Sequence, residues 1–184
     1  MRTLGPVPDR PPVAELIAEL AARLGVPRFV AVCTDLMGGA EREEHVEELR
    51  SLTGHAWQPG DAVFDRDSWG DHWVRSWGAR GLLHVWDDSA TGPVVRGLAD
   101  EHWRPAEMCL KVTASHDVAG AGDGAAALAD HELPRVRAQA MRALAVVGDS
   151  EHLDSVRDHL DDPDEAVRRQ AARALAALSR RLDL

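Results

Sequence analysis

Small and apolar residues recur at a fixed helical spacing through the last two-thirds of the chain. In the segment 164–175, four of them lie at offsets of 0, +4, +7 and +8, which places them on one face of a helix. The same offsets return at three successive steps of 31 residues towards the N-terminus. In chain order the four sets are Val74, Gly78, Gly81 and Leu82; Pro105, Cys109, Val112 and Thr113; Val136, Ala140, Ala143 and Leu144; and Val167, Ala171, Ala174 and Leu175.

This repetition predicts a stack of paired helices. Shorter apolar stretches at 93–98, 125–128 and 153–160 separate the periodic segments, so each unit reads as a helix, a turn, a shorter helix and a turn. One such pair cannot bury its apolar face alone, whereas stacked units bury it against each other. The small residues at offset +4 let neighbouring helices approach closely.

The pattern resembles the HEAT-repeat family, in the short form also called HEAT-like or PBS-lyase-like repeats. The resemblance is carried by 161–175, Asp-Asp-Pro-Asp-Glu-Ala-Val-Arg-Arg-Gln-Ala-Ala-Arg-Ala-Leu, and almost as well by 133–144 followed by Gly-Asp. The unit around Pro105 departs, with Pro105 and Ala106 where Val and Arg are expected, and the unit around Val74 is rich in Trp. The resemblance implies a helical solenoid over about residues 70–184. It implies no single function, because the family includes scaffolds, some enzymes and some nucleic-acid binders.

The first 60 residues show no register with the repeats. Amphipathic or apolar segments at 11–24, 27–37 and 41–52 predict three helices, and 54–68 reads as a loop that either straps the fold or serves a site. We therefore predict an all-α protein, an α-solenoid of HEAT-like helical hairpins with an N-terminal helical cap. Residues 1–60 would pack on about three and a half repeats in 61–184, forming one structural domain.

Composition narrows the classes of partner. The formal net charge of −10 disfavours nucleic acid and anionic membranes, which basic surfaces bind. Two cysteines cannot build a disulfide framework, so a reducing compartment is expected. The first residues, Met-Arg-Thr-Leu-Gly-Pro, do not read as a signal peptide, and no run of about 18 apolar residues predicts a membrane span. These features favour the cytoplasm.

A Trp-rich stretch is the first candidate binding surface. Trp73 and Trp77 occupy the repeat positions that hold Arg135 and Gln139 in a later unit. One interpretation is that the N-terminal helices pack on this flank and the tryptophans form a shared core. The other is an exposed aromatic groove for a partner or ligand, since Trp and Arg are favoured interface anchors. The candidate residues here are Trp69, Trp73, Trp77, Arg80, His84, Trp86 and Asp87.

A second cluster opens the helix expected around Pro105. His102, Trp103 and Glu107 are candidates for a ligand-facing trio. The simpler interpretation is that Asp100 caps the helix and Trp103 packs against its neighbours.

A nucleic-acid alternative comes from similarity to HEAT-like DNA glycosylases of the alkylpurine type. That resemblance would assign lesion binding to aromatic and acidic side chains and DNA binding to a basic concave face. The Arg residues at offset +1 are more simply explained as a ladder paired with Asp in the turns, and the acidic total also counts against the glycosylase. The residues concerned are Trp73, Trp77, Asp87 and Asp88 for the lesion, and Arg75, Arg104, Arg137 and Arg168 for the DNA.

No complete catalytic, cofactor or metal motif is present. The pair His131-Glu132 is expected in a turn, outside the helical position that the His-Glu pairs of HEAT-type iron hydroxylases occupy. Cys109 stands at a small-residue repeat position and Cys33 in an apolar run, so both are expected to be buried rather than nucleophilic. The sequence therefore favours a protein-interaction scaffold over an enzyme, predicts no catalytic, metal or cofactor site, and names another protein as the partner. A small-molecule ligand, held in a closed cavity by His84, His102 or Glu107, is a further alternative.

Overall fold

The computed structural model describes residues 11–183, and within that range the fold is entirely helical, without a strand. The all-α fold class predicted from the sequence is thus confirmed. The described part of the chain divides into two compact units, an N-terminal unit that ends at Val85 and a C-terminal unit that begins at Trp86. The expected lack of a signal peptide concerns residues outside the described range. Among the described residues, no helix has the length and apolar character needed to cross a bilayer.

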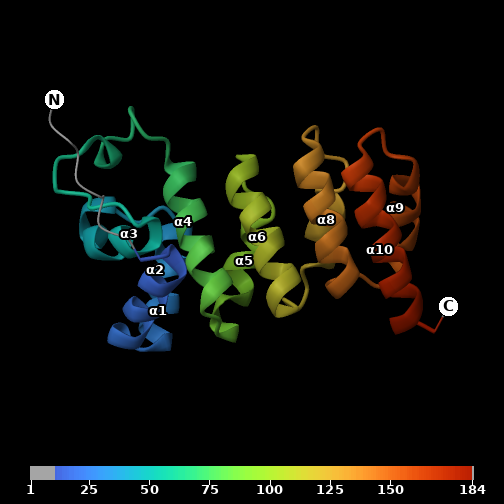
Figure 1. Ribbon diagram of the computed structural model, residues 1–184, viewed down its shortest axis with the longest axis horizontal. Helices are drawn as coiled ribbons and strands as arrows, with labels where there is room; N and C mark the ends of the chain where they lie inside the picture. The colour runs from blue at the N-terminus through green and yellow to red at the C-terminus, as the bar shows by residue number, and fades with distance from the viewer. Residues whose placement is uncertain (1–10, 184) are drawn as a thin grey trace, which may run out of the picture. The chain divides into compact units, whose positions relative to one another are not determined.

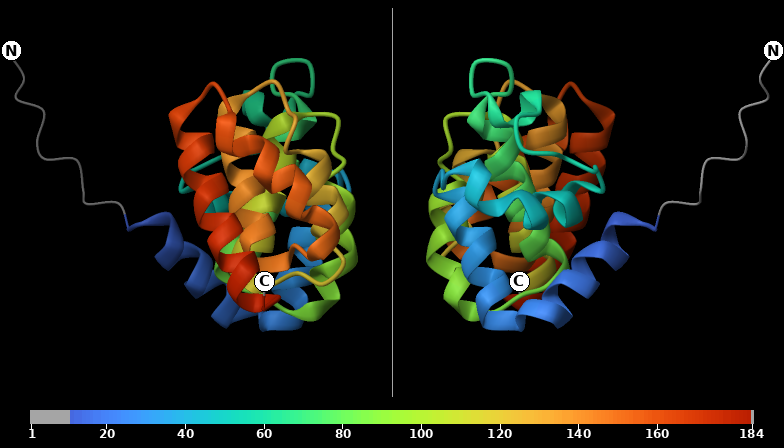
Figure 2. Two further views of the ribbon diagram at one scale, coloured as in Figure 1. Left: turned by 90° about the vertical axis from the view of Figure 1, so that its right-hand side faces the viewer. Right: turned by 90° about the vertical axis from the view of Figure 1, so that its left-hand side faces the viewer.

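Four helices make up the N-terminal unit: α1 (Val13–Leu24), α2 (Val26–Met37), α3 (Val46–Thr53) and α4 (Asp71–His84). α2 packs along α4, α1 packs on α2, α3 and α4, and α3 also packs on α4 (Figures 1 and 2). The helix predicted over 41–52 starts later than expected. Its first part, Arg42–His45, is a 3-10 turn, because the side chain of Arg42 is directed into the protein.

Glycines of α4 allow the close approach to α2. A Cβ added at Gly78 would lie 2.5 Å from the carbonyl oxygen of Cys33 and 3.1 Å from the Cβ of Leu36. A Cβ at Gly81 would collide with the thiol of Cys33. The small residues at repeat offsets +4 and +7 therefore set the helix separation here, as the sequence pattern predicts.

Three helical hairpins make up the C-terminal unit. The short helices α5 (Thr91–Gly97), α7 (Gly122–Ala127) and α9 (Leu153–Asp158) each pack on the long helix that follows. Those long helices are α6 (Trp103–His116), α8 (Pro134–Val147) and α10 (Glu165–Arg181), and α8 lies between α6 and α10 (Figure 1).

The buried ridge follows the predicted 31-residue register. In the C-terminal unit, all the residues at offsets 0, +4 and +7 are buried, and in α4 the same offsets are buried too. Leu175, at offset +8 of α10, is only partly buried. The anchors Val74, Val136 and Val167 point inward, so the period found in the sequence is confirmed as the packing period of the long helices.

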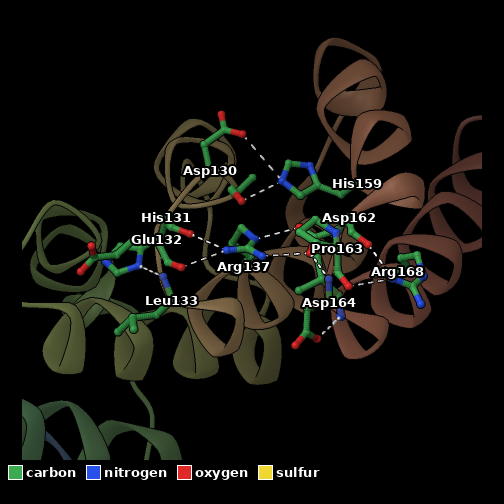
Figure 3. A network of polar contacts seen from close by, with 12 residues as sticks. Asp130, His131, Glu132, Leu133, Arg137, His159, Asp162, Pro163, Asp164 and Arg168 are labelled. Atoms are coloured by element: carbon green, nitrogen blue, oxygen red, sulfur yellow. Dashed lines mark hydrogen bonds and ion pairs between the residues drawn. The ribbon is translucent and has the colours of Figure 1, made fainter.

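A polar network joins the turns of the second and third hairpins (Figure 3). Arg137 of α8 donates through Nε and Nη2 to both carboxylate oxygens of Asp162, at 2.8 and 2.9 Å, and through Nη1 to the carbonyl oxygens of His131 and Glu132. One repeat later, Arg168 donates to the carbonyl oxygens of Asp162 and Pro163. The Arg–Asp pairing expected at offset +1 is confirmed for Arg137, whereas Arg168 donates to backbone carbonyl oxygens of its own turn.

Candidate protein-binding surface

Four tryptophans of the N-terminal unit form one aromatic cluster. Trp69 lies between Trp57, Trp73 and Trp77, with ring centroids 5.8, 5.7 and 5.8 Å away. The cluster joins the 54–70 segment to α4, because Trp57 and Trp69 come from that segment and the other two from the helix. Trp77 is only 5% exposed, whereas Trp69 and Trp73 are partly exposed. Packing therefore accounts for Trp77, and a binding role for Trp69 and Trp73 stays a prediction.

Arg42 holds the segment that carries this cluster. Its side chain is 1% exposed and donates to the carbonyl oxygens of Val63 and Trp69, at 2.5 and 2.6 Å, and to Oδ1 of Asp71, at 2.6 Å. The pKa of Asp71 is lowered: burial alone would raise it, but the hydrogen bond from Arg42 and the charge of Arg66 outweigh the desolvation. The 54–68 segment is thus strapped to the N-terminal unit. The sequence did not predict this role of Arg42, because the residue stands in an acidic run typical of a solvated helix face.

Arg80 and His84 lie further along α4 than the tryptophan rings. Arg80 is partly buried, donates to the carbonyl oxygen of Leu52 at 3.4 Å, and has its pKa lowered by burial. Much of His84 is exposed. Its pKa is lowered mainly by the partial desolvation of its ring and, to a smaller extent, by the positive charge of Arg80. A lowered pKa favours a neutral imidazole, so His84 contributes little positive charge to this end of the helix at neutral pH.

Trp103 is the centre of a cluster in the C-terminal unit. The guanidinium carbons of Arg104 and Arg135 lie 4.4 and 4.8 Å from the centroid of its partly exposed ring. Glu107, one turn along α6, is 7% exposed and accepts from Nη2 of Arg135 at 2.8 and 3.0 Å, while Nζ of Lys111 lies 3.2 Å from it. The buried carboxylate thus fixes Arg135 of α8 beside the indole of α6. The two helices share one polar and aromatic surface.

His102 caps α6 beside this cluster. Its Nδ1 accepts a hydrogen bond from the backbone N–H of Arg104 at 3.2 Å. The backbone N–H of His102 donates to Oδ1 of Asp100 at 2.8 Å. Its ring also stacks on Trp103, with centroids 5.8 Å apart. Of the predicted trio, His102 therefore has a clear structural role. The capping group of α6 is the histidine rather than Asp100, which the simpler interpretation assigned.

Trp86, Asp87 and Asp88 lie in the turn before α5. Trp86 stacks on His116 with centroids 5.1 Å apart, and its Nε1 donates to Asp88 at 3.1 Å. Asp87 accepts from the backbone N–H of Ser89, and hydrogen bonds from Ser89 lower its pKa. Both carboxylates hold the start of the hairpin. Arg137, engaged in the turn network, does not supply the open basic surface that a glycosylase would need.

One group among residues 11–183 could bring metal-ligand atoms together. Asp123, Glu151 and His152 offer ligand atoms within 4.8 Å of one another. The Nδ1 of His152 accepts from the backbone N–H of Asp149 at 2.9 Å, so the ring proton is on Nε2, which faces Asp123 at 3.2 Å. His152 therefore directs a proton rather than a lone pair at the carboxylate. Helix capping accounts for this group better than metal binding.

The two cysteine thiols, those of Cys33 and Cys109, lie in buried surroundings that disfavour the reactive thiolate form. Cys33 and Cys109 are fully buried, and burial raises the pKa of Cys109 to about 12 and that of Cys33 still further. A thiolate nucleophile at neutral pH is thereby excluded. The sequence interpretation of both cysteines as buried packing residues is confirmed.

Comparison with known proteins adds one result. Residues 124–183, which span α7 to α10, match the family model described as HEAT repeats. No curated protein matches the chain. The matched segment contains the two repeat units in which the sequence pattern is clearest.

Proposed function

Because residues 124–183 match HEAT repeats, which are generally protein-interaction scaffolds, we propose that this chain is a protein-binding module. Its contact surface is the shared face of α6, α8 and α10. Trp103, Glu107 and Arg135 lie at one end of this face, near the N-termini of α6 and α8. Helical repeats use such extended faces because side chains from successive units line up in rows.

The preformed Trp103 cluster carries this proposal. Trp and Arg dominate the residues that contribute most to protein–protein binding, and here an indole lies against two guanidinium groups. Glu107 holds Arg135 in place before any partner arrives. Ordering a side chain on binding costs about 0.5–1.5 kcal/mol, so a side chain that is already fixed loses less free energy when a partner docks.

Affinity capture with two tryptophan variants tests the proposal. The tagged full chain, its Trp103→Ala variant and its Trp86→Ala variant are used as baits in lysate of the source organism, and captured proteins are quantified by mass spectrometry. Trp86 is the matched control because it is also partly exposed and stacked on a histidine of the same unit. We expect proteins captured by the wild type to fall at least about tenfold with Trp103→Ala, as for a central interface residue, and to persist with Trp86→Ala.

Circular dichroism shows whether each variant keeps its helical fold. Equal capture by all three baits would contradict the proposal. Loss with Trp73→Ala but not with Trp103→Ala would transfer the binding surface to the aromatic cluster of the N-terminal unit.

A further inference from the structure

The long helices of the C-terminal unit concentrate its positive charge. α6, α8 and α10 contain ten basic residues and only two acidic ones, Glu107 and Glu165. The rest of residues 86–184 contains two basic residues, Arg96 and Arg157, and sixteen acidic ones. Although the net charge of the chain is acidic, α6, α8 and α10 together carry a net positive charge. The ten basic residues are Arg104, Lys111, Arg135, Arg137, Arg142, Arg168, Arg169, Arg173, Arg180 and Arg181.

Some of these cations stabilise the fold, and others face solvent. Arg137, Arg168 and Arg181 donate to carbonyl groups at helix ends and turns. In contrast, Arg142 and Arg173 are exposed on the long helices. The basic surface that a partner can reach therefore differs from the offset +1 ladder.

Three of these cations form a row in the repeat register: Lys111 is partly buried and paired with Glu107, and Arg142 and Arg173 are exposed. Lys111, Arg142 and Arg173 stand at offset +6 of α6, α8 and α10, each 31 residues from the next. Arg135 of α8 and Lys111 of α6 both reach Glu107, which shows that these positions of adjacent helices open on one face. Packed helices lie about 8–10 Å apart, so the row places a positive charge at about every 10 Å.

We infer that this row binds an extended acidic segment of a partner protein. The inference rests on the proposed function, because it names the partner chemistry for the same face. An extended chain advances about 3.3 Å per residue, so carboxylates at every third position match a spacing of about 10 Å.

Charge outside the row favours a peptide over a nucleic acid. A nucleic-acid duplex carries a charge about every 1.7 Å and continues beyond any short row. The turns next to the long helices carry Asp130, Glu132 and Asp161, all exposed, which would repel a continuing polyanion. A short acidic segment concentrates its charge where the cations are and avoids this repulsion.

Fluorescence anisotropy on the full chain tests the inference. The probe is a fluorescein-labelled peptide of five Glu-Ser-Gly triplets. The test variant is Arg142→Gln/Arg173→Gln, and the matched control is Arg96→Gln/Arg157→Gln, which changes the net charge equally at exposed arginines of the short helices. We expect about a tenfold or greater loss of affinity for the test variant, since two charge-assisted contacts are removed, and less than about twofold for the control. Raising the salt concentration should weaken wild-type binding.

Three outcomes would overturn the inference: no peptide binding by the wild type, equal losses for both variants, or tighter binding of a labelled duplex or single-stranded oligonucleotide. The capture experiment separates this inference from the proposed function. Partners that depend on Trp103 but not on Arg142 and Arg173 would leave the protein-binding module intact and reject the acidic segment. If no captured protein depends on Trp103, the proposed contact surface itself fails.

Discussion

The same two repeat positions hold different side chains in α4 and α8, although Trp77 and Gln139 are both buried. In α4 they hold Trp73 and Trp77, whose rings pack in the aromatic cluster of the N-terminal unit. In α8 they hold Arg135, with a side chain 56% exposed, and Gln139, which accepts a hydrogen bond from Arg142. A repeat register thus specifies the ridge that a helix buries, whereas the role of its other face depends on which segment packs there. In α4 that segment is the strap of residues 54–70.

The two units also stabilise their connections differently. The N-terminal unit holds one long segment through two arginines from outside it, the buried Arg42 and the partly buried Arg50, which donates to the carbonyl oxygen of Trp57. The C-terminal unit has short turns that use an arginine of the repeat itself, Arg137 in one turn and Arg168 in the next. The local spacing of the repeats determines how the short turns of the C-terminal unit are held. Only long-range contacts hold the long segment of the N-terminal unit. The substitutions below test this contrast, beginning with the largest expected effect.

Arg137→Ala should destabilise the C-terminal unit by about 3–5 kcal/mol, because it leaves the nearly buried carboxylate of Asp162 without its cation. Urea unfolding followed by circular dichroism measures the loss, and hydrogen exchange locates it at α8 to α10. Arg173→Ala is the control, since exposed substitutions usually change stability by no more than about 0.5 kcal/mol. Equal effects of the two substitutions would show that the turn network contributes little.

Trp77→Gln gives α4 the residue that α8 carries. It should lower the free energy of unfolding by about 3 kcal/mol, because a buried indole is lost from the aromatic cluster. The reciprocal site is expected to be less sensitive. Gln139→Ala should cost about 1 kcal/mol, the value of one hydrogen bond. Denaturant titration of both variants gives the difference, and equal costs would mean that the two faces do not differ in packing.

Gly78→Ala should destabilise the N-terminal unit by about 2 kcal/mol, because its Cβ would lie against the backbone of α2. Gly92→Ala serves as the control, since its nearest neighbour is the flexible end of Arg96 and alanine favours a helix. Thermal unfolding should show a lower midpoint for the first variant and an unchanged or higher one for the second. Tolerance of alanine at Gly78 would contradict the close contact of α2 and α4.

Acid should weaken the Arg–Asp network of the C-terminal unit. The hydrogen bond from Arg137 lowers the pKa of Asp162, so this carboxylate adds stability above its unfolded pKa of about 3.9. That stability is lost as the pH falls through the lowered value. Asp162→Asn removes the charge but keeps an oxygen that can accept from Arg137, so it should cost less than Arg137→Ala, about 1 kcal/mol at neutral pH, and the difference from wild type should shrink below about pH 4. Asp158→Asn, at an exposed site, should leave the pH profile of unfolding unchanged.

Sequence reasoning predicted the helices well and the candidate site only in outline. The long helices, their 31-residue register and the pairing of Arg137 with an Asp of the turns follow from local spacing, and the structure confirms them. The helix expected from residue 41 begins as a 3-10 turn over Arg42–His45, and the burial of Arg42 was missed, because an arginine in an acidic run gives no sign that it will be buried. Trp103 was predicted as a candidate, but its partner Arg135 was not.

The amino-acid sequence by itself determined which ridge each long helix buries, because the spacing of small and apolar residues is a local property of the chain. Only the tertiary structure decided which polar side chains meet. Glu107 and Arg135 are 28 residues apart, and Arg42 and Trp69 are 27 apart. No period of the sequence links either pair. Long side chains reach several alternative partners, and packing of the helices selects among them.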